Sequence, residues 1–129
     1  MCFCIPAGAN GAVYVAYNTT TQLTIAGYSS PTNVTSVNNW IVMQQRVSAS
    51  VNFSQSWVNY RNGFGQYDGN FWLGNQKIFQ LTGAGAWTLR VVMLLSFNHG
   101  WYSVEYDSFS VGSEGTVFSL ICNSYLKSY

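Results

Sequence analysis

The chain has 129 residues, of which 48% are hydrophobic, 17% aromatic and only 7% charged. This length is typical of a single domain, which we expect to span residues 1–129, and it supports a hydrophobic core without disulfides or metals. Five Lys and Arg against four Asp and Glu give a formal net charge of +1. Nucleic-acid and anionic membrane partners are therefore not expected, because both require clustered basic residues.

Neither a membrane span nor an export signal is predicted. The longest apolar run, residues 91–95, is far shorter than the roughly 18 to 20 residues that a spanning helix needs. The residues after Met1 lack the basic start and apolar core of a secretory signal, so we expect a cytosolic protein or a piece of a longer precursor. Three Asn-x-Ser/Thr triplets, beginning at Asn18, Asn33 and Asn52, are candidate N-glycosylation sites if the chain is exported.

Strand signals dominate the first third of the chain. β-branched and aromatic residues predict strands at 13–17 and 23–25, joined by a polar connection. Residues 28–39 are rich in Ser, Thr and Asn and predict a loop. The apolar residues 40–43 are typical of a central strand buried on both faces, and the looser alternation over 47–53 predicts a further strand.

The first of two predicted short helices follows Ser54, whose hydroxyl could cap its amino terminus. Trp57, Tyr60 and Phe64 recur at spacings of three and four, which predicts an aromatic stripe packed into the core. Gly63 is placed where a left-handed residue would end the helix.

The second predicted helix begins at Asn75, a plausible cap, and ends at Gly83. Ile78 and Leu81 lie one turn apart on one face.

If Trp57 or Trp72 is buried, its truncation to Ala should lower the free energy of unfolding by about 3 to 5 kcal/mol.

The last third again predicts strands, with tight loops that favour antiparallel neighbours. We expect Tyr102, Val104 and Tyr106 on a buried face and Ser103 and Glu105 on a wet one. The fold class is α+β: an antiparallel β-sheet with two short helices. A small amino-terminal hairpin region would occupy residues 1–39 and a central sheet region residues 40–129. The predicted strands are 87–93, 101–106, 109–112 and 117–122.

Candidate catalytic groups are few. His99, the only histidine, is expected in a solvated turn. Glu105 and Asp107 could share a strand face, but no other polar group converges with them. Asp68 and Glu114 stand beside glycines and are interpreted as turn-formers. No catalytic residue is predicted.

The three cysteines do not predict a disulfide framework or a metal site. Cys2 and Cys4 are too close for an easy mutual bridge, and a zinc site would need a second pair of ligands. Cys122 falls in an apolar stretch and is predicted to be an inert buried thiol. No metal and no cofactor are predicted from these residues.

A series of blocks from Arg46 onward is far more specific than the rest of the sequence. In their order and spacing they resemble the fibrinogen carboxy-terminal globular domain, the module of fibrinogen chains, ficolins, tenascins and angiopoietins. The resemblance is strongest over residues 40–115 and implies that the aromatic blocks are scaffold. The blocks are Arg46-Val47, Val51-Asn52-Phe53-Ser54-Gln55-Ser56-Trp57, Tyr60-Arg61-Asn62-Gly63-Phe64-Gly65, Asp68-Gly69 and Phe71-Trp72-Leu73-Gly74-Asn75.

Two departures from the family pattern stand out. The resemblance implies a partner cysteine near residues 27–30, where this chain has none, so Cys4 is expected to lack its partner. After Leu89-Arg90 the family usually carries acidic residues, whereas residues 91–95 are all apolar here. That stretch would be an aggregation liability if it were exposed.

The resemblance implies a non-enzymatic, extracellular recognition or adhesion module with a protein or glycan ligand. The family's calcium site and ligand pocket are expected downstream of Tyr129, so no calcium or ligand residue is assigned in this chain. The alternative is a structural or degenerate scaffold, a possible homo-oligomer that packs through a sheet edge. An enzyme is the third possibility and would depend on Glu105 or His99.

Overall fold

The structure is a computed structural model, which describes residues 2–6, 20–23, 32–37, 40–67, 69–83, 85–94 and 100–128. The predicted strand at 13–17, together with Asn18, Asp68 and His99, lies outside the described residues. The elements in chain order are β1 (Cys2–Pro6), β2 (Thr20–Leu23), β3 (Thr32–Val37), β4 (Trp40–Gln45), α1 (Trp57–Asn62), β5 (Phe64–Gly65), β6 (Phe71–Trp72), α2 (Asn75–Thr82), β7 (Leu89–Leu94), β8 (Trp101–Asp107), β9 (Ser110–Val111), the 3-10 helix η1 (Glu114–Thr116), β10 (Leu120–Ile121) and β11 (Ser124–Ser128).

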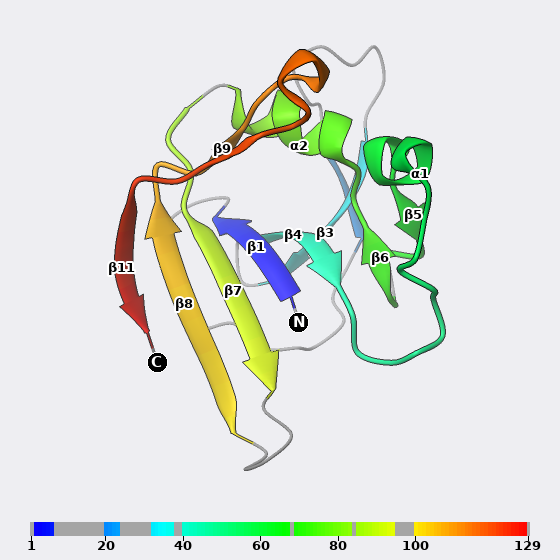
Figure 1. Cartoon of the computed structure of the whole chain (residues 1–129). Helices are drawn as coiled ribbons and strands as arrows, with labels where there is room; N and C mark the ends of the chain where they lie inside the picture. The colour runs from blue at the N-terminus through cyan, green and yellow to red at the C-terminus, as the bar shows by residue number, and fades with distance from the viewer. Residues whose placement is uncertain are drawn as a thin grey trace.

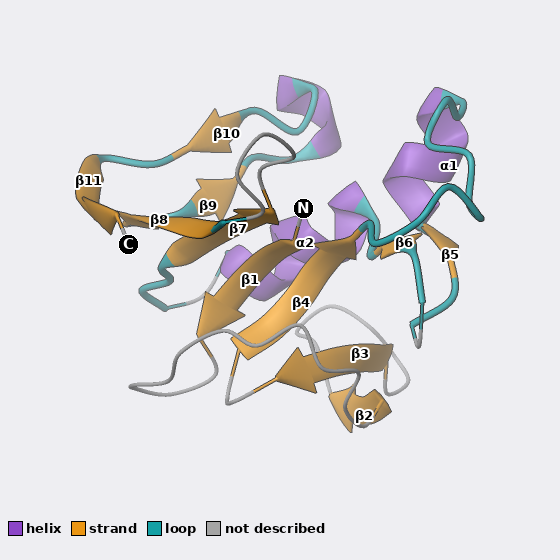
Figure 2. Cartoon of the chain, turned by 90° about the horizontal axis from the view of Figure 1, so that it is seen from below, coloured by secondary structure: helices purple, strands orange, loops and turns teal. Residues whose placement is uncertain are grey.

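One antiparallel sheet organises the described part of the chain. Its strand order is β11-β8-β7-β1-β4-β3-β2, with β5 and β6 branching from β4, and β9 and β10 form a separate two-stranded sheet. Figure 1 shows β1 lying between β7 and β4, with α1 and α2 gathered at one end of the strands. Figure 2 shows β9 and β10 on the same side of the molecule as β8 and β11. The predicted α+β class with two short helices is confirmed.

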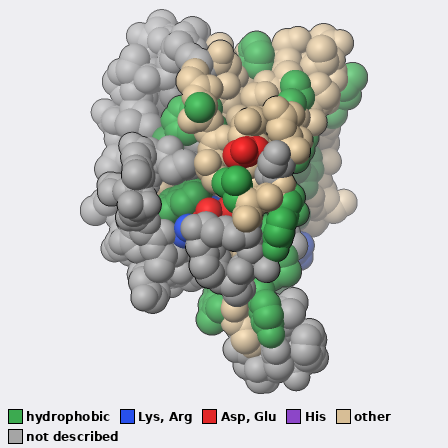
Figure 3. All heavy atoms as spheres, turned by 90° about the vertical axis from the view of Figure 1, so that its left-hand side faces the viewer, with side chains coloured by type: hydrophobic (Ala, Val, Ile, Leu, Met, Phe, Trp, Pro, Cys, Tyr) green, Lys and Arg blue, Asp and Glu red, His purple; other side chains and the backbone are tan. Residues whose placement is uncertain are grey.

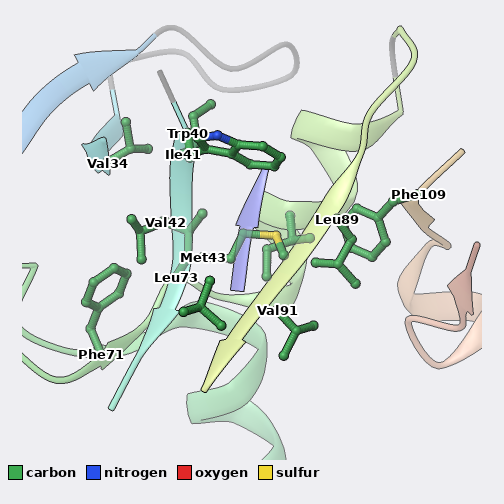
Figure 4. Packing of buried hydrophobic residues seen from close by; sticks show 12 residues of the cluster. Val34, Trp40, Ile41, Val42, Met43, Phe71, Leu73, Leu89, Val91 and Phe109 are labelled. Atoms are coloured by element: carbon green, nitrogen blue, oxygen red, sulfur yellow. The ribbon is translucent and has the colours of Figure 1, made fainter. Parts of the chain in front are cut away.

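β4 is the central strand that its apolar composition predicts. All six of its residues are buried, and it pairs with β1 on one side and β3 on the other. Strands covered on both faces need apolar residues at successive positions, which Trp40-Ile41-Val42-Met43 supplies. Figure 4 shows the side chains of Val42 and Phe71 on one side of this strand and those of Met43 and Leu73 on the other.

Residues 28–39 are not a continuous loop, because Thr32–Val37 forms β3. The segment is rich in β-branched residues, which suit a pleated strand, and Val34 is completely buried. Its register pairs Thr20 of β2 with Thr35 and Trp40 of β4 with Val37. The Ser, Thr and Asn content predicts a loop, but this segment pairs with the strands that precede and follow it in the sequence.

The strand predicted at 47–53 is also absent. The side chain of buried Asn70, rather than a neighbouring strand, forms hydrogen bonds with the start of this segment. The Asn70 Oδ1 accepts hydrogen bonds from the backbone N–H groups of Val47 at 2.6 Å and Ser48 at 3.1 Å. The Asn70 Nδ2 donates to the Ser48 Oγ at 2.7 Å and the Ser50 Oγ at 2.6 Å. Because one side chain pairs these polar groups, the segment after β4 stays irregular and exposed.

α1 spans Trp57–Asn62 as predicted, but its cap and its packing differ. Ser56, rather than Ser54, accepts the backbone N–H of Asn59 at 3.2 Å. Trp57 is 48% exposed, and Phe64 lies in β5 beyond the helix, so the predicted buried stripe is wrong for Trp57. Gly63 ends the helix at φ 96°, and a Cβ there would lie 2.4 Å from the Leu73 carbonyl oxygen.

α2 ends at Gly83 as predicted, and its first turn follows Gly74. The Asn75 side chain does not cap the helix; its Oδ1 accepts from the Trp72 Nε1 at 3.0 Å. The Lys77 Nζ donates to the Asn62 carbonyl oxygen at 3.0 Å, which connects α2 to the last turn of α1. Burial lowers the pKa of Lys77 below its ordinary value.

Phe71 and Trp57 provide a matched test of which aromatic side chain stabilises the fold. Phe71 is fully buried, so Phe71→Ala should lower the free energy of unfolding by about 3 to 5 kcal/mol. Trp57→Ala should lower it by about 1 kcal/mol or less, because half of that side chain is already in water. Urea denaturation of both variants measures the difference, and equal losses would contradict the burial seen here.

Candidate functional site

The acidic residue Glu105, considered above as a catalytic candidate, belongs to a buried ion pair. It lies directly opposite Arg90 in the β7–β8 ladder, and the Arg90 Nε donates to the Glu105 Oε1 at 2.6 Å. The Arg90 Nη2 donates to the same oxygen. The guanidinium carbon is 4.1 Å from the centre of the Trp40 ring, a cation–π arrangement. These contacts give Glu105 a structural role.

The predicted wet face of β8 is therefore wrong at Glu105, which is only 5% exposed. Tyr102, predicted to be buried, is exposed instead. Alternation alone cannot reveal a buried carboxylate whose cation stands on the neighbouring strand. A buried charge is tolerated when it is paired and hydrogen-bonded.

Asp107 is the second acidic candidate on β8. Asp107 is half-buried two residues further along β8, and its backbone oxygen accepts from the Asn123 N–H at 3.3 Å. Among the described residues, no group of three His, Cys, Asp or Glu side chains could hold a metal ion.

No described helix is long and apolar enough to cross a membrane.

Glu114 opens η1 and contributes to a junction between two distant segments. Its Oε1 lies 3.3 Å from the Arg61 Nη1 of α1, with both side chains well exposed. The rings of Trp57 and Phe118 pack beside this pair, with centroids 5.8 Å apart. An exposed ion pair and one ring contact thus join α1 to the chain that follows η1.

The backbone just after η1 turns one apolar side chain outward and the next inward. Val117 and Phe118 both have left-handed dihedrals, with φ values of 58° and 51°, which are rare for β-branched or bulky residues and cost about 1 to 3 kcal/mol each. Two backbone hydrogen bonds hold this turn. The Val117 N–H donates to the Glu114 carbonyl oxygen at 2.8 Å, and the Phe118 N–H donates to the Ser113 carbonyl oxygen at 3.0 Å. As a result Val117 is 67% exposed and Phe118 is buried.

These segments create the candidate functional site, which we call the α1–β10 surface. Its members are large apolar side chains with substantial exposure on α1 and on the segment from η1 through β10: Trp57, whose ring packs on buried Phe118, and Val117, Leu120 and Ile121. Apolar residues grouped in this way on a soluble domain mark interaction sites, and Trp is prominent among the residues that dominate binding energy. This surface is not predicted from the sequence, because Trp57 is expected to pack into the core and residues 117–122 are expected to form a strand.

The face on the β11 side of the molecule has a similar composition. Figure 3 shows hydrophobic side chains in several places among uncharged polar ones, with few charged groups visible. Tyr125 of β11 is exposed, and its ring lies 6.1 Å from that of Tyr106 in β8.

The cysteines and the glycan acceptors occupy different settings. Cys122 is a free, exposed thiol, so the predicted buried thiol is wrong; it follows β10, a short strand whose two residues are both exposed. Cys2 and Cys4 lie in β1, opposite Gln45 and Val42 of β4. Asn52 is exposed before α1, whereas Asn33 lies within β3.

The comparisons with known proteins show the family. The family model for the fibrinogen beta and gamma chains, C-terminal globular domain, matches residues 8–128. The chain therefore belongs to the fibrinogen C-terminal domain family, and the resemblance noted in the sequence is confirmed.

Individual relatives agree with this assignment. Ryncolin-4 of Cerberus rynchops is 41% identical over 87 residues, which cover 67% of this chain and 25% of that protein. Human Ficolin-3 is 40% identical over 86 residues, covering 67% of this chain and 28% of Ficolin-3. The chain thus spans about a quarter of the length of these curated relatives.

Solved structures share the fold. Lamprey fibrin D-dimer, solved with the peptide ligand Gly-His-Arg-Pro-amide, matches with a TM-score of 0.71 and 35% identity over 78% of this chain and 34% of that one. The fibrinogen-like globe domain of human ANGPTL2 matches with a TM-score of 0.79 and 29% identity over 84% of this chain and 52% of that one.

The role assigned to Glu105 can be tested by breaking and then replacing its ion pair. Glu105→Gln leaves the Arg90 charge buried and should lower the free energy of unfolding by about 3 to 5 kcal/mol. The double variant Arg90→Met/Glu105→Leu removes both charges and should recover most of that loss. Chemical denaturation measures the free energy of unfolding of the single and double variants. A Glu105→Gln protein as stable as the wild type would refute the structural role.

Proposed function

We propose that this chain is a non-enzymatic recognition or adhesion module of the fibrinogen-related type, acting outside the cell on a protein or glycan ligand. Family membership supports this, since the relatives include Ficolin-3 and Ryncolin-4, and the lamprey fibrin D-dimer holds a peptide. The buried pairing of Glu105 with Arg90 argues against an enzyme that depends on that carboxylate.

The observation that carries the proposal is the α1–β10 surface. Its Trp57 ring has one part packed on Phe118 and the rest exposed, which holds a large flat group in place without hiding it. Such a ring can stack on a sugar or fill a pocket of a protein partner at low entropic cost. The Arg61–Glu114 pair places polar, charged groups beside the apolar centre, as at the rim of a recognition site.

Two probes test recognition directly: immobilised Gly-His-Arg-Pro-amide peptide and an immobilised N-acetylated glycan, each with calcium and with a chelator. We expect saturable binding to one of them, weakened at least tenfold by Trp57→Ala. Val47→Ala is the matched control, because Val47 is 46% exposed, close to the 48% of Trp57, but lies outside the surface. Biolayer interferometry measures the affinity of the wild type and of both variants for each probe. Failure to bind either probe, or equal weakening by both variants, would contradict the proposal.

A structural, self-associating scaffold is the second candidate function, and β11 is the observation that favours it. β11 is the terminal strand on its side of the described sheet, paired with β8, and its Leu126 is exposed. Such edges can pair with another copy of the chain. Sedimentation of the same protein separates the candidates, since a scaffold forms a calcium-independent oligomer that Leu126→Lys dissociates and Val47→Lys does not.

A further inference from the structure

The acceptor triplet Asn52-Phe53-Ser54 lies in the irregular segment between β4 and α1. Asn52 and Ser54, which are the two residues that a glycosylating enzyme recognises, are both exposed. The segment also presents Ser48 and Ser50 to solvent, so a large substituent at residue 52 would extend into water rather than into the core.

Phe53 anchors the triplet from its middle. Its ring lies edge-on to Phe64 with centroids 5.1 Å apart, and the Arg46 guanidinium carbon is 5.2 Å from the ring centre. The Tyr60 hydroxyl donates to the Phe53 carbonyl oxygen at 2.7 Å. With the central side chain held toward the protein, its two neighbours are presented to solvent.

The acceptor amide has a defined orientation. The Asn52 Oδ1 accepts the Ser54 N–H at 2.9 Å, which closes a local turn. This turn uses the side-chain oxygen and leaves the nitrogen, the atom that bonds to a glycan, out of the contact. The Gln55 Nε2 donates to the Asn52 carbonyl oxygen at 2.7 Å, so the contacts around Asn52 are local in sequence.

The triplet that begins at Asn33 has a contrasting environment. Asn33, Val34 and Thr35 all lie within β3 and are in register with residues of β2. Val34 is completely buried. Presenting this triplet to an enzyme after folding would break a strand ladder, whereas presenting the Asn52 triplet disturbs only local contacts.

We propose that Asn52 is a site of N-linked glycosylation in this protein. The Asn52 Nδ2 attacks the anomeric carbon of a lipid-diphosphate-linked oligosaccharide, forming an N–C bond while the C–O bond to the diphosphate breaks. The lipid diphosphate leaves with the bonding electron pair, the amide nitrogen loses one proton, and no redox change occurs. The inference rests on the proposed function, because this chemistry is available to an exported chain.

The test expresses the full chain behind a cleavable export signal in animal cells and analyses total protein from cells and medium. Peptide-N-glycosidase in heavy-oxygen water converts a glycan-bearing asparagine into isotopically heavy aspartate, which peptide mass spectrometry locates. We expect the heavy label at residue 52. The variants Asn52→Gln and Ser54→Ala should each abolish it, and the matched control Ser54→Thr should retain it.

Recovery of residue 52 as unmodified asparagine from protein that has entered the secretory pathway, shown by removal of the signal, would overturn the inference. This outcome is distinct from a failure of the proposed function. Occupancy of Asn52 is read from a peptide mass and requires no ligand, while the binding measurement can be made on protein without any glycan.

Discussion

The buried ion pair between Arg90 and Glu105, packed against Trp40, is the interaction on which the rest of the sheet depends. Arg90 lies on β7, Glu105 on β8 and Trp40 on β4, and β1 runs between β7 and β4. A slip of one residue between β7 and β8 would bury a charge without its partner, which costs several kcal/mol. The ion pair therefore fixes the register of β7 against β8, and the Trp40 ring extends the contact to β4.

The segments that form the candidate recognition site lie outside this fixed centre. α1 and the turn after η1 meet through the Arg61–Glu114 pair and the Trp57–Phe118 contact, both near the surface. The Val111 N–H donates to the Thr82 Oγ1 of α2 at 3.0 Å, and this bond joins β9 to the helices. Because few buried contacts depend on Trp57 or Val117, the exposed side chains can serve binding without a large cost to stability.

Local patterns predicted those parts of the fold that their own composition or terminal residues identify. The apolar residues 40–43 identified β4, glycines 63 and 83 marked the ends of α1 and α2, and the aromatic blocks identified the family. The errors arose where distant partners decide. Glu105 is buried because Arg90 stands opposite it, and Asn70 rather than a neighbouring strand pairs the backbone N–H groups of Val47 and Ser48. The candidate site was missed for the same reason, since only the left-handed turn at Val117 shows which apolar side chains face water.

Native-state amide hydrogen exchange measures whether the strands around the ion pair open together. We expect the most protected amides of β4, β1, β7 and β8 to exchange with one common free energy, equal to that of global unfolding. Amides of α1 and of the β9–β10 hairpin should exchange at lower free energy. If β7 and β8 opened well below the global free energy while β4 and β1 remained protected, the ion pair would not couple these strands and the account would be wrong.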